Sequence, residues 1–479
     1  MKEIVFSKMS WSLIRDPIYN YIDFNKDIEK PIIDSTPVQR LRWLRQLQLA
    51  NMVYPGADHT RFQHSVGVMH LAGLFAEKLA REYKELVGDL EGYSIDALVE
   101  IARITGLLHD VGHGPFSHAF EEAIYWSKKL PIPNHEEAGI YIVKYSEIAK
   151  VLEEYGILDP VLEILSSKKP GSRVLSLIRN TVKEWVYPAD IMDFLLRDSY
   201  YAGTREYGIV DYARLIKLSH VNPEDPSSIS LEEKALGALA GYLRNRISMF
   251  ENVYIHPVSS IFSHTVVLMM RRDDELTNYY SEAIEKLSEG EIKPYLELTD
   301  YQALVHAKMT AEEHKDEELR ILAESAFSRK LLWKLLYEQK ILVEPRELAG
   351  LTGSLILKKS KEILKELSKN LHDRLLDSIL SSDASNFWVS INTLKPIPPV
   401  PGGTIQLCRV TDGKVVNTVK MSIPEFLDRE GIKLRLIIRV YAPRTIVKEE
   451  EKLKTAEKIA KETLMEFITP TGLFTGITM

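Results

Sequence analysis

The sequence predicts a mainly helical protein that ends in a small α+β unit, and three patterns support this class. Apolar residues recur at helical spacing through most of residues 37–381 of the 479-residue chain. The segment PIPPVPGG at residues 396–403 then breaks the pattern. Beyond it, apolar and polar residues alternate as they do in strands. We therefore expect a main helical domain with an N-terminal extension over residues 1–275, a helical region over 276–395, and the α+β unit over 396–479.

The predicted elements begin with a short hairpin-like stretch, DPIYNYIDFNKD, within residues 1–33. Helical spacing of apolar residues follows. The predicted helices are residues 37–48, 65–83, 95–109, 136–156, 159–167, 172–184, 189–202, 231–253 and 257–272. The helix at 95–109 is apolar nearly all round towards its end, so we expect it to be central.

In the second half of the chain, charged residues become more frequent and strand patterns follow the helical ones. A charge-rich helical region is predicted over roughly residues 277–381, and its basic run KKSKEILKELSK is interpreted as a solvated helix face. Further on, TIQLCRV and VVNTVKM flank TDGK, whose Asp-Gly pair is the turn signal of a β-hairpin. KLRLIIRVYA is a further strand candidate, and EEEKLKTAEKIAKETLMEFI is typical of a helix.

Composition limits the class of protein. A formal net charge of −7 gives no global basic field, so stable nucleic-acid binding is not expected. A single cysteine, Cys408, cannot form an intramolecular disulfide and fits a reducing compartment. The N-terminus lacks the apolar core of a signal peptide, and no apolar run reaches the length of a membrane span. We expect a cytoplasmic protein without a membrane partner.

Histidines cluster early in the chain, and this clustering indicates a metal site. Seven of the thirteen lie between His59 and His135. In LLHDVGHGPFSH, residues 107–118, His109 and Asp110 stand at the predicted end of the apolar helix, before Gly112, Gly114 and Pro115 break it. Imidazole nitrogen and carboxylate oxygen together suit a divalent first-row ion such as Mn, Fe, Ni, Co or Zn.

Two further ligands must come from elsewhere in the chain. His64, in RFQHSVG, and Asp190, in YPADIMDFLLRD, each stand near the predicted start of a helix, where a side chain can project into a cleft. A lone His-Asp pair carries little information, but the three motifs in this order favour a metal site over coincidence. Such a set leaves coordination positions open for water and substrate.

At these residues the chain resembles the HD-domain phosphohydrolase superfamily, and within it the branch of the deoxynucleoside triphosphate triphosphohydrolases. QRLRWLRQL, YPGADHTRFQHSVG and HDVGHGPFSH carry the resemblance, which runs from about residue 14 to about residue 265. It implies an HD-domain helical core in the first unit and one divalent metal ion held by His64, His109, Asp110 and Asp190. It also implies a nucleotide substrate, which Mg can accompany, and a homo-oligomer, either a dimer or a tetramer.

The resemblance also implies roles for other residues. Those implied in catalysis are His113, His118, His135 and Glu136. Those implied in substrate binding are Gln46 and Leu47 at the sugar and base, Asp198 at the 3′-hydroxyl, Tyr254 near the sugar, and Arg61 and Arg246 at the phosphates. Those implied in an effector nucleotide site are Asp34, Gln39, Arg42, Asp211 and Arg214.

The chain departs from the family at four of these places. Two lysines of the family's triphosphate site are Ile191 and Pro257 here, and the tyrosine that packs on the sugar is Phe194. An asparagine of the effector site is Arg15. The departures concern triphosphate and effector binding, and they leave the metal ligands intact.

The resulting hypothesis is hydrolysis of a nucleotide phosphate ester, with a deoxynucleoside triphosphate (dNTP) converted to deoxynucleoside and triphosphate. A metal-activated water attacks the α-phosphorus, Arg61 and Arg246 balance the charge, and His118 or His113 protonates the leaving oxygen. Asp193 is interpreted as structural, paired with an arginine such as Arg197. His59 and His70 are interpreted as structural, and Asp198 as either a substrate contact or a structural ion pair.

Two other readings remain. Within enzymes, the same site could act on nucleoside monophosphates, cyclic dinucleotides or alarmones, and the changes at Ile191 and Pro257 keep these open. In a different class, a nucleotide-sensing or nucleic-acid-binding protein could carry a vestigial metal site. Only the leading hypothesis, dNTP hydrolysis, releases intact triphosphate, so a substrate panel separates it from the other enzymes. Tight ligand binding without turnover would indicate the binding protein.

Overall fold

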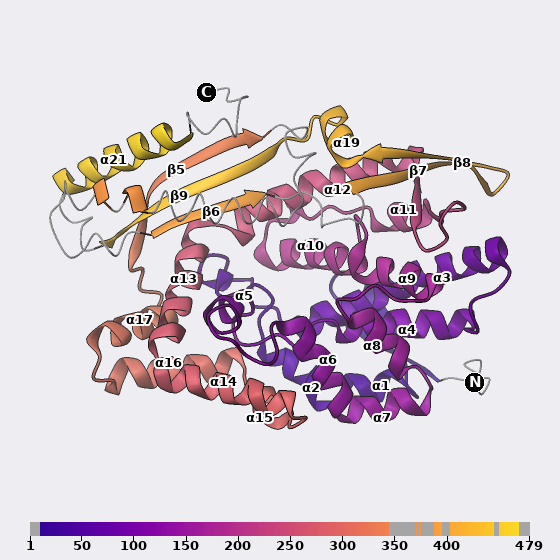
Figure 1. The fold of residues 1–479 in the computed structure, drawn as a ribbon, viewed down its shortest axis with the longest axis horizontal. Coiled ribbons are helices and arrows are strands. Elements are labelled where there is room, and N and C mark those ends of the chain that lie inside the picture. Colours follow the sequence, from indigo (N-terminus) through magenta and orange to yellow (C-terminus); the bar gives the residue numbers. More distant parts are fainter. Residues whose placement is uncertain are drawn as a thin grey trace.

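Helices form most of the molecule, and two small sheets cover one side (Figure 1). The computed structural model describes residues 10–343, 369–371, 373–374, 388–394, 403–444 and 450–468. This confirms the mainly helical class that the sequence predicts.

The chain begins with the predicted hairpin, in which β1 (Trp11–Asp16) pairs antiparallel with β2 (Asn20–Asn25). The Asp16 carboxylate accepts hydrogen bonds from the backbone N–H groups of Ile18 and Tyr19, at 2.8 and 3.0 Å. These bonds form the turn and direct Tyr19 into the core, where its side chain is buried.

Two long helices that pack along each other form the centre, α3 (Arg61–Val87) and α4 (Ile95–Leu108). A capping box between Thr60 and Gln63 begins α3, and the Ser94 side chain caps α4. A Cβ added at Gly106 would lie 3.0 Å from the Val68 carbonyl oxygen, so this glycine lets the two helices approach closely. The predicted central helix is confirmed, and α10 (Ala189–Ala202) packs against α3 from another side.

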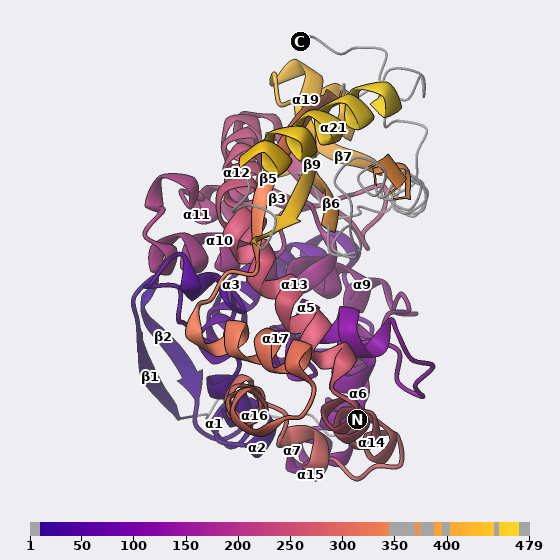
Figure 2. The same ribbon diagram turned by 90° about the vertical axis from the view of Figure 1, so that its left-hand side faces the viewer.

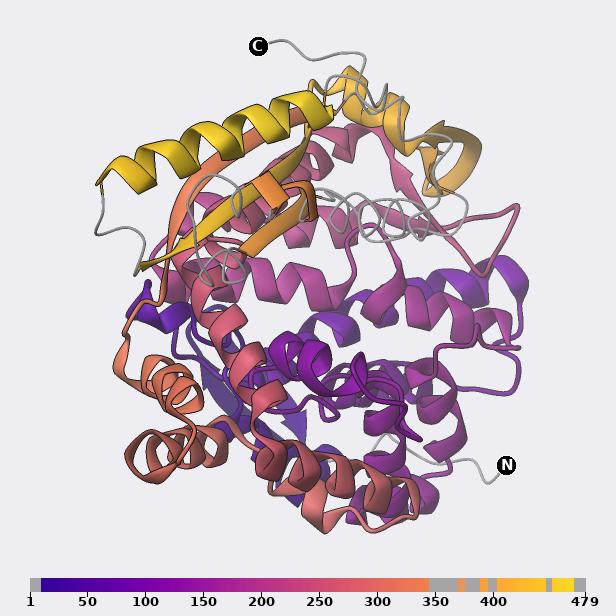
Figure 3. The same ribbon diagram turned by 60° about the vertical axis from the view of Figure 1, so that its left-hand side comes forward.

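The other helices of the first 272 residues surround this centre (Figure 3). They are α1 (Glu29–Ile33), α2 (Thr36–Arg40), α5 (His118–Phe120), α6 (His135–Tyr145), α7 (Glu147–Glu154), α8 (Leu158–Leu165), α9 (Arg173–Arg179), α11 (Tyr212–Lys217), α12 (Leu236–Met249) and α13 (Pro257–Arg272). Wider π-helical turns, Glu121–Tyr125, Asn180–Glu184 and Phe250–Tyr254, follow α5, α9 and α12.

Three predicted helices differ from those observed. Instead of one helix over residues 37–48, α2 ends at Arg40, because the backbone at 44–46 bonds to residues 59–61: Gln46 N–H donates to His59 O and Arg61 N–H to Leu44 O. The helix predicted over 136–156 is divided at Ser146, which caps α7. The helix predicted over 231–253 begins only at Leu236, because Ile229–Glu232 forms a strand.

Four helices follow α13 and gather below it in Figure 1. They are α14 (Asp274–Ser288), α15 (Lys293–Leu296), α16 (Asp300–Glu313) and α17 (Glu317–Ser328). They pack on α2, α6 and α13. The helical prediction for the start of this region is therefore confirmed.

Both sheets combine strands from distant parts of the chain. One has the order β3-β4-β7-β8, with strands Ser219–Val221, Ile229–Glu232, Thr404–Thr411 and Lys414–Ser422, and its β4–β7 pair is parallel. The other has the order β5-β9-β6, with strands Trp333–Val343, Leu434–Pro443 and Trp388–Leu394. Helices α19 (Ile423–Arg429) and α21 (Glu450–Ile468) complete this part. The predicted hairpin at TDGK, the strand in KLRLIIRVYA and the final helix are confirmed.

The helical prediction is wrong for residues 333–343, which form β5 along the full length of β9. This segment is a strand because it pairs with another strand about 100 residues later in the chain. The local spacing of charged residues does not indicate that pairing. The runs KKSKEILKELSK and PIPPVPGG lie, apart from their last residues, outside the described part. Each of these two sheets combines strands from both sides of a predicted boundary. The division into three units stays a prediction.

Among the residues described, no single helix is long and apolar enough to cross a membrane. One bent pair, Glu233–Tyr254 with Pro257–Arg272, passes the same test by length and composition taken together.

Candidate active site

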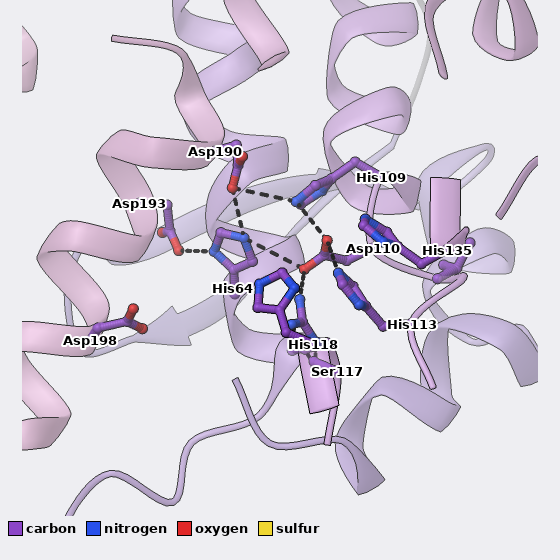
Figure 4. Close-up of polar contacts among 12 residues, drawn as sticks. His64, His109, Asp110, His113, Ser117, His118, His135, Asp190, Asp193 and Asp198 are labelled. Atoms are coloured by element: carbon purple, nitrogen blue, oxygen red, sulfur yellow. Dashed lines mark hydrogen bonds and ion pairs between the residues drawn. The ribbon is translucent and has the colours of Figure 1, made fainter. Parts of the chain in front are cut away.

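Three helices bring the four predicted metal ligands together (Figure 4). His64 lies in the first turn of α3, Asp190 in the first turn of α10, and His109 and Asp110 follow α4. The closest distances are 3.2 Å from His64 Nε2 to Asp190 Oδ1 and 3.3 Å from His109 Nε2 to Asp110 Oδ1. His109 Nε2 lies 3.6 Å from Asp190 Oδ1, and His64 Nε2 lies 3.8 Å from Asp110 Oδ2.

The orientation of both imidazoles fits a divalent ion. Each Nδ1 has an outer partner, Asp193 Oδ2 at 2.8 Å for His64 and Gly106 O at 2.7 Å for His109, so each Nε2 faces the carboxylates. His109 Nε2 is buried and has no hydrogen-bond partner in the described protein. Two such nitrogens and two carboxylates form a donor set for a first-row divalent metal.

The carboxylates of the cluster create a negative electrostatic environment, which stabilises positively charged groups. Burial lowers the pKa of His64, but the contacts with Asp190 and Asp193 outweigh burial and raise it to about 10. Burial raises the pKa of the Asp190 carboxyl, yet the contacts with His109 and His64 hold it below its ordinary value. A divalent cation would satisfy the same carboxylates.

Asp193 stands behind His64 in a buried network. Besides His64 Nδ1, it accepts hydrogen bonds from Arg197 Nε and Nη2, both at 2.9 Å, and from the Tyr19 hydroxyl at 2.8 Å. Arg197 also pairs with Asp16, at 2.8 Å. The predicted Asp193–Arg197 pair is therefore confirmed, and the N-terminal hairpin supports a metal ligand through Tyr19 and Asp16, which the sequence did not indicate.

Arg61 is buried and lies between the cluster and the next loop. Its Nη1 pairs with Asp110, while Nε and Nη2 donate to Ser117 Oγ at 3.0 and 2.8 Å. Arg61 therefore forms an ion pair with an acid and also lines the cavity, and its contact with a phosphate stays a prediction. The Arg61 guanidinium holds Asp110 and the loop before His118 in fixed positions.

Three histidines flank the cluster on one side. His113 is buried, its Nε2 lies 3.3 Å from Asp110 Oδ1, and its ring stacks on His135 at 3.8 Å. Burial, together with the Arg61 charge, lowers the pKa of His113 well below its usual range. By contrast, the His118 side chain is 70% exposed, and its Nδ1 lies 2.9 Å from Glu121 Oε2.

Glu121 is a site residue that sequence reasoning missed. Its second oxygen pairs with His135 Nδ1, so one carboxylate orients both His118 and His135. Burial raises the pKa of Glu121, but the two histidines outweigh burial and hold it far below its ordinary value. The available signal was its place three residues after His118, at helical spacing on the same face.

A cavity of about 580 Å³ opens over the cluster. Its wall includes the four predicted metal ligands, Arg61 and the three flanking histidines. The predicted sugar- and base-binding residues Gln46, Leu47, Asp198 and Tyr254 also line it. Apolar side chains complete this lining: Ala50, Phe194, Phe250, Val253 and Ile255. A cavity of this size accommodates a nucleotide.

Asp198 is fixed by two neighbours. One oxygen lies 2.7 Å from His59 Nε2, and the other accepts the Tyr254 hydroxyl at 2.9 Å. His59 stacks on Tyr201 and is structural, as predicted. Asp198 is thus held by these two partners and also lines the cavity, and its contact with a substrate stays a prediction.

Two cations stand close to the cavity besides Arg61. Arg246 is buried, its Nε and Nη1 lack partners in the described structure, and its guanidinium lies over the wall residues Phe194 and Phe250. Lys183 lines the cavity, with Nζ 2.7 Å from Leu165 O and 3.6 Å from Glu136 Oε1. The sequence did not indicate Lys183, because it lies on a π-helical turn that no motif includes.

The predicted effector residues lie outside this cavity and form local contacts. Gln39 Oε1 accepts from Arg42 Nε at 2.8 Å, and the Arg42 guanidinium covers the Phe62 ring. Asp34 pairs with Lys30. Asp211 caps α11 by accepting from the Arg214 N–H, and Arg214 donates to Lys234 O at 2.8 Å. The structure thus pairs Gln39 with Arg42 and Asp211 with Arg214, whereas Asp34 pairs with a residue outside the predicted set, and an effector role stays a prediction.

Comparison with known proteins assigns the central part of the chain. Residues 61–219 match the family model of the HD domain. The chain is 34% identical over 252 residues to the uncharacterised protein MJ1154 of Methanocaldococcus jannaschii, covering 52% of this chain and 47% of that one. It is 28% identical to the human deoxynucleoside triphosphate triphosphohydrolase SAMHD1, over 55% of this chain and 45% of that one. The chain thus spans about half the length of these two relatives.

Two further comparisons extend over most of the chain. The SAMHD1 protein of Gallus gallus is 26% identical, over 90% of this chain and 72% of that one. A crystal structure of a hypothetical protein from Aquifex aeolicus has a TM-score of 0.66 and 24% identity, and the match covers 94% of this chain and 100% of that one. The second likeness shows that the overall fold occurs elsewhere.

Proposed function

Since residues 61–219 of this chain form an HD domain, we propose that the protein is a metal-dependent phosphohydrolase that converts a dNTP to deoxynucleoside and triphosphate. The observation that carries the proposal is the cluster of His64, His109 and Asp190 in the wall of a nucleotide-sized cavity. Asp110 and the Glu121–His118 pair lie beside it. The likeness to the deoxynucleoside triphosphate triphosphohydrolases SAMHD1 of Gallus gallus and Homo sapiens supports the choice of substrate.

Different residues of the cavity would bind the phosphates and the nucleoside of the substrate. His64, His109, Asp110 and Asp190 would hold a divalent ion, which would supply Lewis acidity towards water and a phosphoryl oxygen. Arg61 and Arg246 stabilise negative charge on the phosphates, and Lys183 adds a third cation at the cavity wall. Lys183 would replace part of the charge that Ile191 and Pro257 do not provide.

His118 is the better candidate for the general acid. It is exposed to the cavity, and Glu121 fixes its Nδ1, so its Nε2 can deliver a proton to the leaving 5′-oxygen. His113 is buried against Asp110 and the His135 ring, so it is better placed to orient that carboxylate. His135 shares Glu121 with His118 and positions the carboxylate from the other side.

The other end of the cavity suits a deoxynucleoside. Leu47, Val253 and Ile255 provide apolar surface for the base, and Gln46 can hydrogen-bond to it. Gln46 Oε1 is buried and lacks a hydrogen-bond partner in the described structure. Asp198, held by His59, can accept a hydrogen bond from the 3′-hydroxyl when the Tyr254 hydroxyl moves away.

The test is a product analysis. The purified protein is incubated with Mn²⁺ and each of the four dNTPs, alone and mixed, and the products are separated by ion-exchange chromatography. We expect deoxynucleoside and intact triphosphate from the wild type and loss of both from Asp110→Ala. Asp159→Ala, at an exposed acid outside the cavity, is the matched control and should retain activity.

Other outcomes have defined meanings. Turnover only in the mixture would support a nucleotide effector, and size-exclusion chromatography with and without dNTPs tests the proposed homo-oligomer. No turnover of any dNTP by metal-loaded protein would refute the proposal. Nucleoside monophosphates and cyclic dinucleotides would then be the next substrates, because they need fewer cations than a triphosphate.

A further inference from the structure

The loop that carries His113 and His118 has a backbone that cannot be stable by itself. Phe116 and Ser117, immediately before His118, have φ values of 55° and 50°. Residues other than glycine seldom adopt this left-handed conformation, and two in succession require that neighbouring groups hold them. The same loop passes so close to α6 that a Cβ at Gly112 would lie 2.0 Å from His135 O.

A segment beyond the HD match holds this loop at two places. The Asp300 carboxylate accepts the Phe116 N–H at 2.7 Å with one oxygen and the Arg45 N–H at 2.8 Å with the other. The Tyr295 hydroxyl donates to Gly112 O at 2.6 Å. Asp300 and Tyr295 are both buried. Each restraint acts on loop backbone, and Arg45 directly precedes the cavity residues Gln46 and Leu47.

A buried arginine joins the same two parts of the chain. Arg40, at the end of α2, donates to Leu298 O at 3.1 and 2.7 Å, to Val111 O at 3.2 Å and to His113 O at 2.8 Å. Figure 2 shows α15 beside α2, and the two helices are in contact. Carbonyl groups from both segments therefore bind one guanidinium, which ties residues 295–300 to the loop.

We infer that Tyr295–Asp300, together with Arg40, forms a clamp that fixes the His113–His118 loop, and that Asp300 is a positioning residue for the reaction. The inference rests on the proposed function for its catalytic readout. Both hydrogen-bond partners of the Asp300 carboxylate are backbone N–H groups. Asp300 is neither in contact with a predicted metal ligand nor part of the cavity wall. It acts on the position of His118 through Phe116, and on Gln46 through Arg45.

Charge strengthens the Asp300 restraint. A carboxylate accepts both N–H groups, whereas a carboxylic acid presents a hydroxyl to one of them. Burial raises the pKa of the Asp300 carboxyl to about 6, against the opposing effects of the two N–H bonds. The charged and titratable groups that face it are Arg40, Arg45, Arg61 and Tyr280. The clamp is therefore expected to be tighter above this pH than below it.

The first arm of the test compares Asp300→Asn with the wild type on the best dNTP from pH 5 to 8. Asn keeps the shape and removes one acceptor, so at pH 7.5 we expect kcat to fall about tenfold while KM changes less than threefold. Near pH 5 the two proteins should converge to within about twofold, since neutral Asp and Asn accept similarly. A merely structural role would give the same loss at every pH.

A matched control is available in α14. Asp274 is also the first residue of its helix but is exposed and does not reach the loop, so Asp274→Asn should behave as wild type throughout. Tyr295→Phe removes the bond to Gly112 O, and with it the bond to the Tyr125 hydroxyl, without changing charge, and we expect a pH-independent loss of about threefold in kcat. Equal losses in Asp300→Asn and Asp274→Asn would overturn the inference.

The second arm does not depend on activity. Hydrogen exchange followed by mass spectrometry should show faster exchange of residues 110–120 in Asp300→Asn, with residues 61–87 unchanged. If the wild type hydrolyses no nucleotide, the proposed function fails, while this arm still decides whether the clamp exists. Unchanged exchange of residues 110–120 would overturn the clamp whatever the activity.

Discussion

Replacement of Asp193 with asparagine tests how the chain holds the metal. Asp193 is fully buried and binds His64 Nδ1, two nitrogens of Arg197 and the Tyr19 hydroxyl. An amide replaces one carboxylate oxygen with an NH₂ group, which must then face either the His64 N–H or the Arg197 guanidinium. Removal of such an outer partner typically costs about 10–100-fold in metal affinity, or roughly 1.4–2.7 kcal/mol.

The same change also weakens a buried ion pair, and the two effects must be separated. Loss of one partner of a buried pair costs about 3–5 kcal/mol of folding free energy, and the remaining pair of Arg197 with Asp16 reduces this cost. Asp16→Asn is therefore the matched control, because it weakens the same arginine and leaves His64–Asp193 intact. Both variants should melt at lower temperature, and only Asp193→Asn should bind metal more weakly.

Isothermal titration of metal-free protein with Mn²⁺ or Zn²⁺ measures this difference directly. The expected result is a Kd for Asp193→Asn at least tenfold above that of Asp16→Asn, with one ion bound per chain in both. Equal dissociation constants for the two variants would refute the reasoning that Asp193 orients His64 for the ion.

Three further predictions concern the proton donor, the cation at the cavity wall and metal–proton competition. Glu121→Gln should lower kcat about 10–100-fold with little change in KM, because His118 loses the carboxylate that orients it; initial rates over a range of dNTP concentrations check this. Lys183→Gln should raise KM for dNTPs about tenfold, whereas Lys144→Gln, at an exposed lysine outside the cavity, should not; unchanged KM in both would exclude Lys183 from substrate binding. The His64 pKa is raised to about 10, so in metal-free protein its stabilising contribution is present below about pH 6.5 and is lost as pH rises through 10. Mn²⁺ binding at pH 7 should accordingly release about one proton, measured by titration in buffers of different ionisation enthalpy.

Local rules determine where the predicted metal ligands lie along the chain, and the structure brings them close together, although their role in binding metal stays a prediction. His109 follows an apolar helix that ends where glycines and a proline follow, and Asp190 comes just after Pro188 at a helix start. The helix predicted over 189–202 has the observed bounds, and the Asp-Gly turn at residues 412–413 joins β7 and β8 as predicted. Motifs and local spacing were sufficient for these elements.

Other features depend on contacts between distant segments, which no local pattern records. β5 is a strand because β9 lies beside it, and α2 ends at Arg40 because residues 44–46 bond to 59–61. Lys183 and Asp300 reach the site or its supporting loop only through the tertiary fold. Tyr19 supports His64 from 45 residues earlier in the sequence, through Asp193.

We expect water to attack the α-phosphorus and to break its bond to the 5′-oxygen. Phosphorus NMR of a dNTP reaction in water enriched with oxygen-18 follows this step. The expected first phosphorus product is triphosphate, with the label on the phosphorus that was α and none in the deoxynucleoside. Release of orthophosphate or pyrophosphate before triphosphate, or label in the 5′-hydroxyl group, would show that water attacks another atom.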